Sequence, residues 1–132
     1  MSLFDWLLVA HLVGDFLLQT PGMARGKEES WGWLAVHVAL YMLPLSAVLG
    51  GYIAGQGLPR LSLMTVAVAW FVLAGSHALL DRRGFTRWWM RHILGVSSDH
   101  WLSVAVDQVF HIVILALVAQ ALALAGAQGM VG

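Results

Sequence analysis

The sequence predicts an all-α integral membrane protein: four transmembrane helices in a bundle, plus a short amphipathic interfacial helix between the third and the fourth. The first observation is composition, because 60% of the 132 residues are hydrophobic, only 11% are charged and the mean hydropathy is +0.79. These values exclude an ordinary water-soluble globule. The second observation is that four apolar stretches reach the length needed to cross a bilayer. The length of the chain allows a single domain, residues 1–132.

The first predicted span covers residues 3–19 and ends where Pro21-Gly22 stops a helix. No positively charged region precedes it, so we expect a retained span and not a cleaved secretory signal. His11, Asp15 and Gln19 recur at every fourth residue, which places them on one stripe of an α-helix. A polar stripe on an otherwise apolar helix requires polar partners on neighbouring helices.

The other three predicted spans, residues 31–52, 61–80 and 101–125, supply such partners. Helices are expected for all of them, because inside a bilayer every backbone group must find its hydrogen bond within the segment or close to it. The second span contains His37, and the third contains His77 with Asp81 four residues later. The fourth reverses this order, with Asp107 and Gln108 preceding His111.

Residues 82–98, between the third and fourth spans, form the predicted interfacial segment. Arginines alternate there with apolar residues at roughly helical spacing: Arg82, Arg83, Arg87 and Arg91 with Phe85, Trp88, Trp89, Ile93 and Leu94. This mixture is typical of an amphipathic helix in the lipid headgroup layer. Two roles remain open for it, a topological anchor and a phospholipid-headgroup site beside the polar residues of the spans.

The distribution of basic residues predicts the orientation in the membrane. Six of the seven basic residues lie between the first and second spans or between the third and fourth, and the seventh is Arg60. Loops rich in Lys and Arg remain in the cytoplasm, so both termini are expected on the non-cytoplasmic side. The formal net charge is zero, which gives no reason to expect nucleic acid as a partner and leaves membrane lipid as the expected one.

The polar residues of the spans are predicted to share one layer in the cytoplasmic half of the bundle. At a rise of 1.5 Å per residue, Asp15, His37, His77 and Asp107 lie roughly 6–10 Å inside the cytoplasmic helix ends, His11 and His111 about one turn deeper, and Asp81 and Gln19 at the cytoplasmic mouth. Each such group costs about 2.5 kcal/mol or more in hydrocarbon, so they must pair, bind an ion or line water.

Imidazoles and carboxylates together favour a divalent transition metal, Zn²⁺, Mn²⁺ or Fe²⁺, and the absence of cysteine excludes thiolate ligands. The candidate ligands are His11, Asp15, His37, His77, Asp107 and His111. They exceed what one tetrahedral ion needs, so we expect either two ions or one ion with outer carboxylates. Asp81 is the candidate general base, and Gln19 and Gln108 are expected to orient ligands or substrate.

These motifs resemble a family of small bacterial multi-pass membrane proteins catalogued as a domain of unknown function. Its sequences carry His-x-x-x-Asp-Phe-x-x-Gln, a His in the second span, His-x-x-x-Asp and finally Asp-Gln-x-x-His. Here these are His11, Asp15, Phe16 and Gln19; His37; His77 and Asp81; and Asp107, Gln108 and His111. The resemblance covers essentially the whole chain and implies a location in the bacterial cytoplasmic (inner) membrane. It implies no established activity.

The chemistry of the predicted cluster favours a metal-dependent hydrolase of a lipid-linked or phosphate-containing substrate, in which a bound ion lowers the pKa of water toward ~7. Three alternatives remain: transport of a divalent cation or proton, binding of haem or another cofactor, and a purely structural Asp-His network that glues helices together. Polar residues become sparse beyond mid-membrane, which disfavours transport, and haem would leave the carboxylates unexplained.

Overall fold

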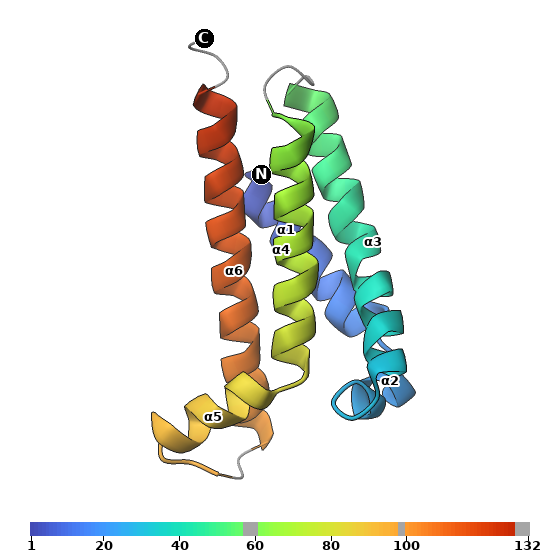
Figure 1. Cartoon of the computed structure of the whole chain (residues 1–132), viewed down its shortest axis with the longest axis vertical. Helices are drawn as coiled ribbons and strands as arrows, with labels where there is room; N and C mark the ends of the chain where they lie inside the picture. The colour runs from blue at the N-terminus through green and yellow to red at the C-terminus, as the bar shows by residue number, and fades with distance from the viewer. Residues whose placement is uncertain (57–60, 98–99, 129–132) are drawn as a thin grey trace.

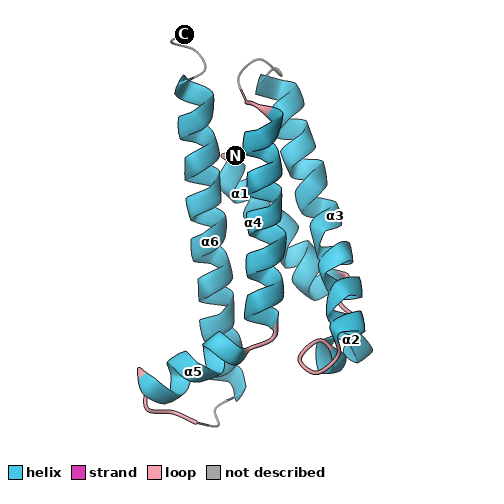
Figure 2. Ribbon diagram, in the orientation of Figure 1, coloured by secondary structure: helices cyan, strands magenta, loops and turns pink. Residues whose placement is uncertain are grey.

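The computed structural model describes residues 1–56, 61–97 and 100–128, and every regular element in these ranges is helical (Figure 2). The elements are α1 (Leu3–Leu12), the π-helix η1 (Val13–Leu17), α2 (Pro21–Gly26), α3 (Trp31–Gln56), α4 (Leu63–Asp81), α5 (Gly84–His92) and α6 (His100–Gln128). The prediction of an all-helical chain is confirmed for these residues. The predicted loop position of Arg60 lies outside them, as does Ser98 at the end of the predicted interfacial segment.

Three helices stand side by side and form the body of the bundle, with α4 packed against both α3 and α6 (Figure 1). Three stretches are long and apolar enough to cross a membrane: Trp31–Gly55, Leu63–Asp81 and His100–Gln128. They agree with the second, third and fourth predicted spans to within a few residues at each end. The structure is therefore that of a membrane protein.

The helix in the first predicted span, residues 3–19, is shorter than predicted. The helix runs through the ten residues of α1 and the five of η1 and ends at Leu17. Its length is about 22 Å at 1.5 Å per residue, against a hydrocarbon core of about 30 Å. It crosses the bundle obliquely, packed on α3 and α6, and the N-terminus lies below the upper ends of the long helices, beside the upper part of α6 (Figure 1).

A short helix, α2, occupies the segment that was expected to be a loop between the first two spans. Thr20 caps it by accepting a hydrogen bond from the Met23 backbone, and Pro21 occupies its first turn. Gly26 allows it to lie against α3, because a Cβ at this position would be 2.5 Å from Trp33 Cδ1. This packing carries Lys27 toward the interior of the bundle.

Helix α5 lies across the end of the bundle that also holds α2 (Figure 1). Arg83 turns the chain between α4 and α5 with a left-handed backbone, φ 52°. Thr86 and Met90, one helical turn apart, are buried beneath α5, whereas Phe85 and Trp88 are exposed. The helical part of the predicted interfacial segment is thus Gly84–His92.

Apolar side chains occupy both the outer surface and part of the interior of the bundle, unlike those of a water-soluble protein. Large apolar side chains such as Leu63, Phe71 and Leu79 are 70–86% exposed on the outside. Inside, Leu7, Leu45, Leu73 and Leu115 form an apolar layer, each at most 2% exposed. A polar layer lies next to it, toward α2 and α5.

Candidate metal centre

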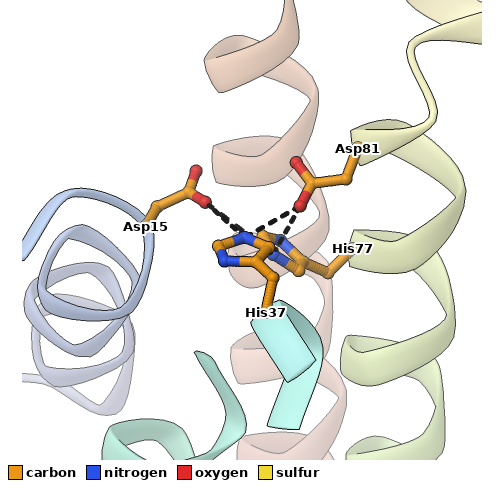
Figure 3. A group of neighbouring side chains, drawn as sticks. All are labelled: Asp15, His37, His77 and Asp81. Carbon is orange, nitrogen blue, oxygen red and sulfur yellow. Dashed lines mark hydrogen bonds and ion pairs between the residues drawn. The ribbon is translucent and has the colours of Figure 1, made fainter. Parts of the chain in front are cut away.

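The polar layer contains nine buried polar or charged residues, none more than 5% exposed. They are His11, Asp15, Lys27, His37, His77, Asp81, Thr86, Asp107 and His111. Two groups among them could hold a metal ion, because their ligand atoms all lie within 4.8 Å of one another. The first group is Asp15, His37, His77 and Asp81 (Figure 3), and the second is Asp81, Asp107 and His111.

The ligand atoms of the first group have the spacing of a metal site. His37 Nε2 lies 3.0 Å from His77 Nε2, 3.2 Å from Asp15 Oδ1 and 2.9 Å from Asp81 Oδ2. His77 Nε2 lies 3.1 Å from Asp81 Oδ2 and 3.8 Å from Asp15 Oδ1. Ligands around a tetrahedral ion with bonds of about 2.0–2.1 Å are separated from one another by about 3.3 Å.

Hydrogen bonding alone accounts poorly for this convergence. A neutral imidazole carries a single N–H proton, yet His37 Nε2 faces another imidazole nitrogen and two carboxylate oxygens. Asp81 Oδ2 lies close to both imidazoles without hydrogen-bond geometry to either of them. Lone pairs that converge in this way could hold a metal ion.

The π-helix η1 positions Asp15 within this group, and Gly14 allows it to do so. A Cβ at Gly14 would lie 2.8 Å from Tyr41 Cδ2 and 3.0 Å from the Tyr41 Cα. Only glycine therefore lets η1 approach α3 this closely, and His37 lies one turn before Tyr41 on α3. Single turns of π-helix occur frequently at functional sites, where they re-aim side chains.

Tyr41, which was not predicted as a site residue, orients two histidines. Its ring stacks on that of His77, with centroids 3.5 Å apart and planes within 2°. Its hydroxyl lies 3.2 Å from His11 Nδ1. Neither His37 Nδ1 nor His77 Nδ1 has a hydrogen-bond partner among the described residues, so packing holds the His77 ring. The sequence signal for Tyr41 is its position four residues after His37.

His11 lies outside both groups, although it was a candidate ligand. Its Nε2 lies 2.9 Å from Gln108 Oε1, and its Nδ1 faces the Tyr41 hydroxyl, so both ring nitrogens have partners. Gln108 in turn donates a hydrogen bond of 2.8 Å to Asp15 Oδ2. The chain from Tyr41 through His11 and Gln108 leaves Asp15 Oδ1 facing the other ligands. His11 therefore helps to position Asp15 through Gln108.

The second group shows a tautomer suited to metal binding. His111 Nδ1 donates to the Asp107 backbone carbonyl at 2.9 Å, which leaves the lone pair on Nε2. That Nε2 atom is buried and has no partner among the residues that the structure describes. Metal-binding histidines characteristically donate their other N–H to a carbonyl or carboxylate. Asp107 Oδ1 accepts a hydrogen bond of 3.0 Å from Thr86 on α5.

Lys27 is the buried residue that sequence reasoning missed most clearly. Its Nζ lies 2.8 Å from Asp81 Oδ1, 3.8 Å from Asp15 Oδ1 and 3.5 Å from His37 Nε2. With neutral imidazoles, three buried carboxylates and one ammonium leave two net negative charges in the cluster. A divalent cation would balance them. Lys27 sits in a polar segment that gave no sign of burial, because its position depends on how α2 packs.

Two predicted positions were wrong. Asp81 was expected at the cytoplasmic mouth, but it is 1% exposed and belongs to both groups, because α5 and the segment after α2 cover this end of α4. Gln19 was expected on the stripe with His11 and Asp15. The helix ends at Leu17, so Gln19 lies beyond it, partly exposed and in neither group.

A family model described as "Protein of unknown function (DUF3307)" matches residues 3–129. The chain belongs to this family. The match runs from the start of α1 to the end of α6 and includes every residue of the two groups. Neither the curated proteins nor the solved structures gave a match. The family description carries no activity, so the chemistry of the buried cluster is what bears on function.

Proposed function

We propose that this DUF3307 protein is a membrane metalloenzyme that uses a divalent Zn²⁺, Mn²⁺ or Fe²⁺ site to hydrolyse a lipid-linked or phosphate-containing substrate. The observation that carries the proposal is the convergence of four ligand atoms, from η1, α3 and α4, in a buried layer: all lie within 4.8 Å of one another, and each imidazole nitrogen lies 2.9–3.8 Å from the other three atoms. Asp81 belongs to both groups, so a second ion would share this carboxylate with the first.

A bound divalent ion would supply an activated water and polarise the scissile oxygen. The protein must then accept the proton of that water. Asp81 contacts both imidazoles and Lys27, which suits a ligand better than a free base. Asp107 is the remaining carboxylate, held by Thr86 through Oδ1, and with one ion in the first group it is our candidate base.

Continuous transport is disfavoured by the apolar layer. Leu7, Leu45, Leu73 and Leu115 come from four different helices and close the bundle on one side of the metal centre. A path for a divalent cation requires polar groups or water along its length. An apolar layer on one side of the cluster favours a site whose substrate would enter from the other side.

We propose that the end of the bundle that holds α2 and α5 faces the cytoplasm of a bacterium, with α5 in the headgroup layer. In this arrangement α1 and η1 enter the inner membrane as a fourth, short segment. Both termini would then be directed to the non-cytoplasmic side. Six of the seven basic residues lie in the segments around α2 and α5, which share one end of the bundle (Figure 1). The exposed Phe85 and Trp88 suit α5 to the interface.

This orientation predicts the outcome of cysteine labelling. Arg25→Cys and Arg91→Cys should be shielded from a membrane-impermeant thiol reagent in intact cells, whereas Ala54→Cys should react, and all three positions are exposed. Lys27 and Thr86 are unsuitable for labelling because their side chains are buried. Reaction at Arg25→Cys and Arg91→Cys, with protection at Ala54→Cys, would place the metal centre toward the non-cytoplasmic side.

Two aspartate variants test the catalytic proposal. Asp81→Asn should lose both bound metal and turnover, since it removes a charge shared by both groups. Asp107→Asn should keep the ion of the first group while turnover falls about 10²–10⁴-fold, the range that general-base catalysis contributes. Metal is measured by elemental analysis and turnover by mass spectrometry of bacterial lipid extracts.

Glu29→Gln serves as the control for these variants, because Glu29 is exposed and carries the same charge. It should match the wild type in metal content and in turnover. Metal-loaded wild-type protein that leaves the lipids unchanged, or that moves the ion across a sealed vesicle, would overturn the hydrolase proposal.

A further inference from the structure

A second polar feature lies at the same end of the bundle as the metal centre. It is a pocket of about 340 Å³ between α5, the start of α6 and the segment that follows α2. Its charged and polar lining consists of Glu28, Arg83, Arg87, Arg91, Ser97, His100 and Ser103. We call it the arginine pocket. No residue of the two metal-binding groups lines it.

The charges of the arginine pocket favour an anion. Three guanidinium groups face a single carboxylate, which leaves two net positive charges with a neutral His100. Arginine presents a planar fork of N–H donors that matches the geometry of phosphate oxygens. Arg83 Nε is buried and, although 3.3 Å from Glu28 Oε1, makes no hydrogen bond among the described residues. A guanidinium nitrogen in this state needs an acceptor.

Glu28 occupies the position that an anionic ligand would take. Arg87 Nη1 donates to Glu28 Oε2 at 2.9 Å, and Arg83 Nε approaches the other carboxylate oxygen. The Arg87 side chain is 56% exposed, and an ion pair this exposed contributes little to stability. A phosphate group offers more acceptor oxygens than a carboxylate, so it can displace Glu28 from the two arginines.

The arginine pocket adjoins the metal centre along several elements. Four stretches of chain each supply one residue to the buried cluster and one to the pocket: Lys27 and Glu28, Asp81 and Arg83, Thr86 and Met90, and Asp107 and Ser103. The residues of each of the last two pairs are four positions apart on one helix, about 6 Å along the axis. A group bound in the pocket thus lies next to the metal centre.

We infer that the arginine pocket binds the phosphate group of a membrane lipid and forms the phosphate subsite of the substrate. This inference rests on the proposed function for the role of the phosphate. The lipid source follows from α5, which carries the exposed Phe85 and Trp88 on the same helix as Arg87, and from the exposed Ile93 and Leu94 that follow it. Apolar side chains around a basic pocket suit an amphiphile whose chains remain in the bilayer.

The test is a titration of the full-length protein in a neutral detergent. The probes are dioctanoyl phosphatidic acid, dioctanoylglycerol, which has the same chains without phosphate, and inorganic phosphate. Calorimetry should show saturable binding of the phosphatidic acid and at least tenfold weaker binding of the other two. Arg87→Ala/Arg91→Ala should weaken phosphatidic acid binding at least tenfold, and Glu28→Gln should strengthen it several-fold.

Two single-site controls each remove one charge of the same sign outside the pocket. Arg25→Ala removes an exposed arginine and Glu29→Gln an exposed glutamate, neither of which lines the pocket, so both should bind phosphatidic acid as the wild type does. Equal binding of dioctanoylglycerol, equal binding of inorganic phosphate, or unchanged binding by the double arginine variant would overturn the inference.

The titration is repeated with chelator present, so that phosphate cannot bind through a metal ion. Binding measured in this way, compared with lipid turnover, separates the two proposals. Phosphatidic acid binding that depends on the arginines, in a protein that turns over no lipid, would refute the hydrolase and keep the arginine pocket as a lipid-binding site. Lipid turnover that is unaffected by Arg87→Ala/Arg91→Ala would refute the pocket and keep the hydrolase.

Discussion

Purified wild-type protein is expected to carry one or two divalent transition-metal ions per chain, and the double replacement His37→Ala/His77→Ala should abolish binding in the first group. The two Nε2 atoms are 3.0 Å apart and supply half of that group's ligand atoms. Elemental analysis after removal of loosely bound ions measures the metal content. His92→Ala is a suitable control, because His92 is exposed on α5 and belongs to neither group.

The same experiment separates a metal centre from a structural Asp-His network. Removing a bound ion would leave two uncompensated negative charges in the cluster, so chelator should lower the unfolding temperature of the wild type. An ion present at 100 times its dissociation constant stabilises a protein by about 2.7 kcal/mol. If the only ion is in the first group, the double variant should show no response to chelator, and a remaining response would indicate an ion in the second group. Wild-type protein that is folded, metal-free and indifferent to added Zn²⁺, Mn²⁺ or Fe²⁺ would contradict the metal centre and favour the network.

Gly14→Ala is expected to damage the metal centre without changing any of its ligands. The added Cβ would meet both the ring and the backbone of Tyr41 at 2.8–3.0 Å, and backbone cannot turn aside as a flexible side chain can. Helix η1 must then move away from α3 and carry Asp15 from His37. Overpacking of this kind costs about 1–3 kcal/mol, and we expect metal affinity to fall at least about fivefold.

Gly51→Ala provides the matched control for this prediction. Gly51 also lies in a helix, but a Cβ added there has nothing within 4 Å. Alanine at such a position should be neutral or stabilise the helix by about 0.5–1 kcal/mol. Both variants are compared by thermal unfolding in the same detergent and by metal content. If Gly14→Ala behaves as Gly51→Ala does, the close approach of η1 to α3 is not what positions Asp15.

The long helices and most of the buried cluster were predictable from local patterns. Hydropathy over about 20 residues located α3, α4 and α6, because a span must keep apolar side chains toward lipid along its whole length. The same rule made His37, His77, Asp107 and His111 conspicuous. A polar group in a membrane span avoids lipid by facing the interior of the bundle, and the structure buries all four of these residues there.

Tertiary packing decided which of these residues face one another. The sequence alone was sufficient to predict a helical membrane protein with a layer of imidazoles and carboxylates. Each span must be apolar enough to leave water for the bilayer, so its few polar residues stand out in the sequence. Contacts between distant segments decide three points that the sequence left open. They place His11 against Gln108 and outside the two groups, bury Asp81 inside the bundle, and bring Lys27 into the cluster. The π-helix at Gly14 and the covering positions of α2 and α5 set those contacts. Their geometry arises from close packing between elements, which no local periodicity records.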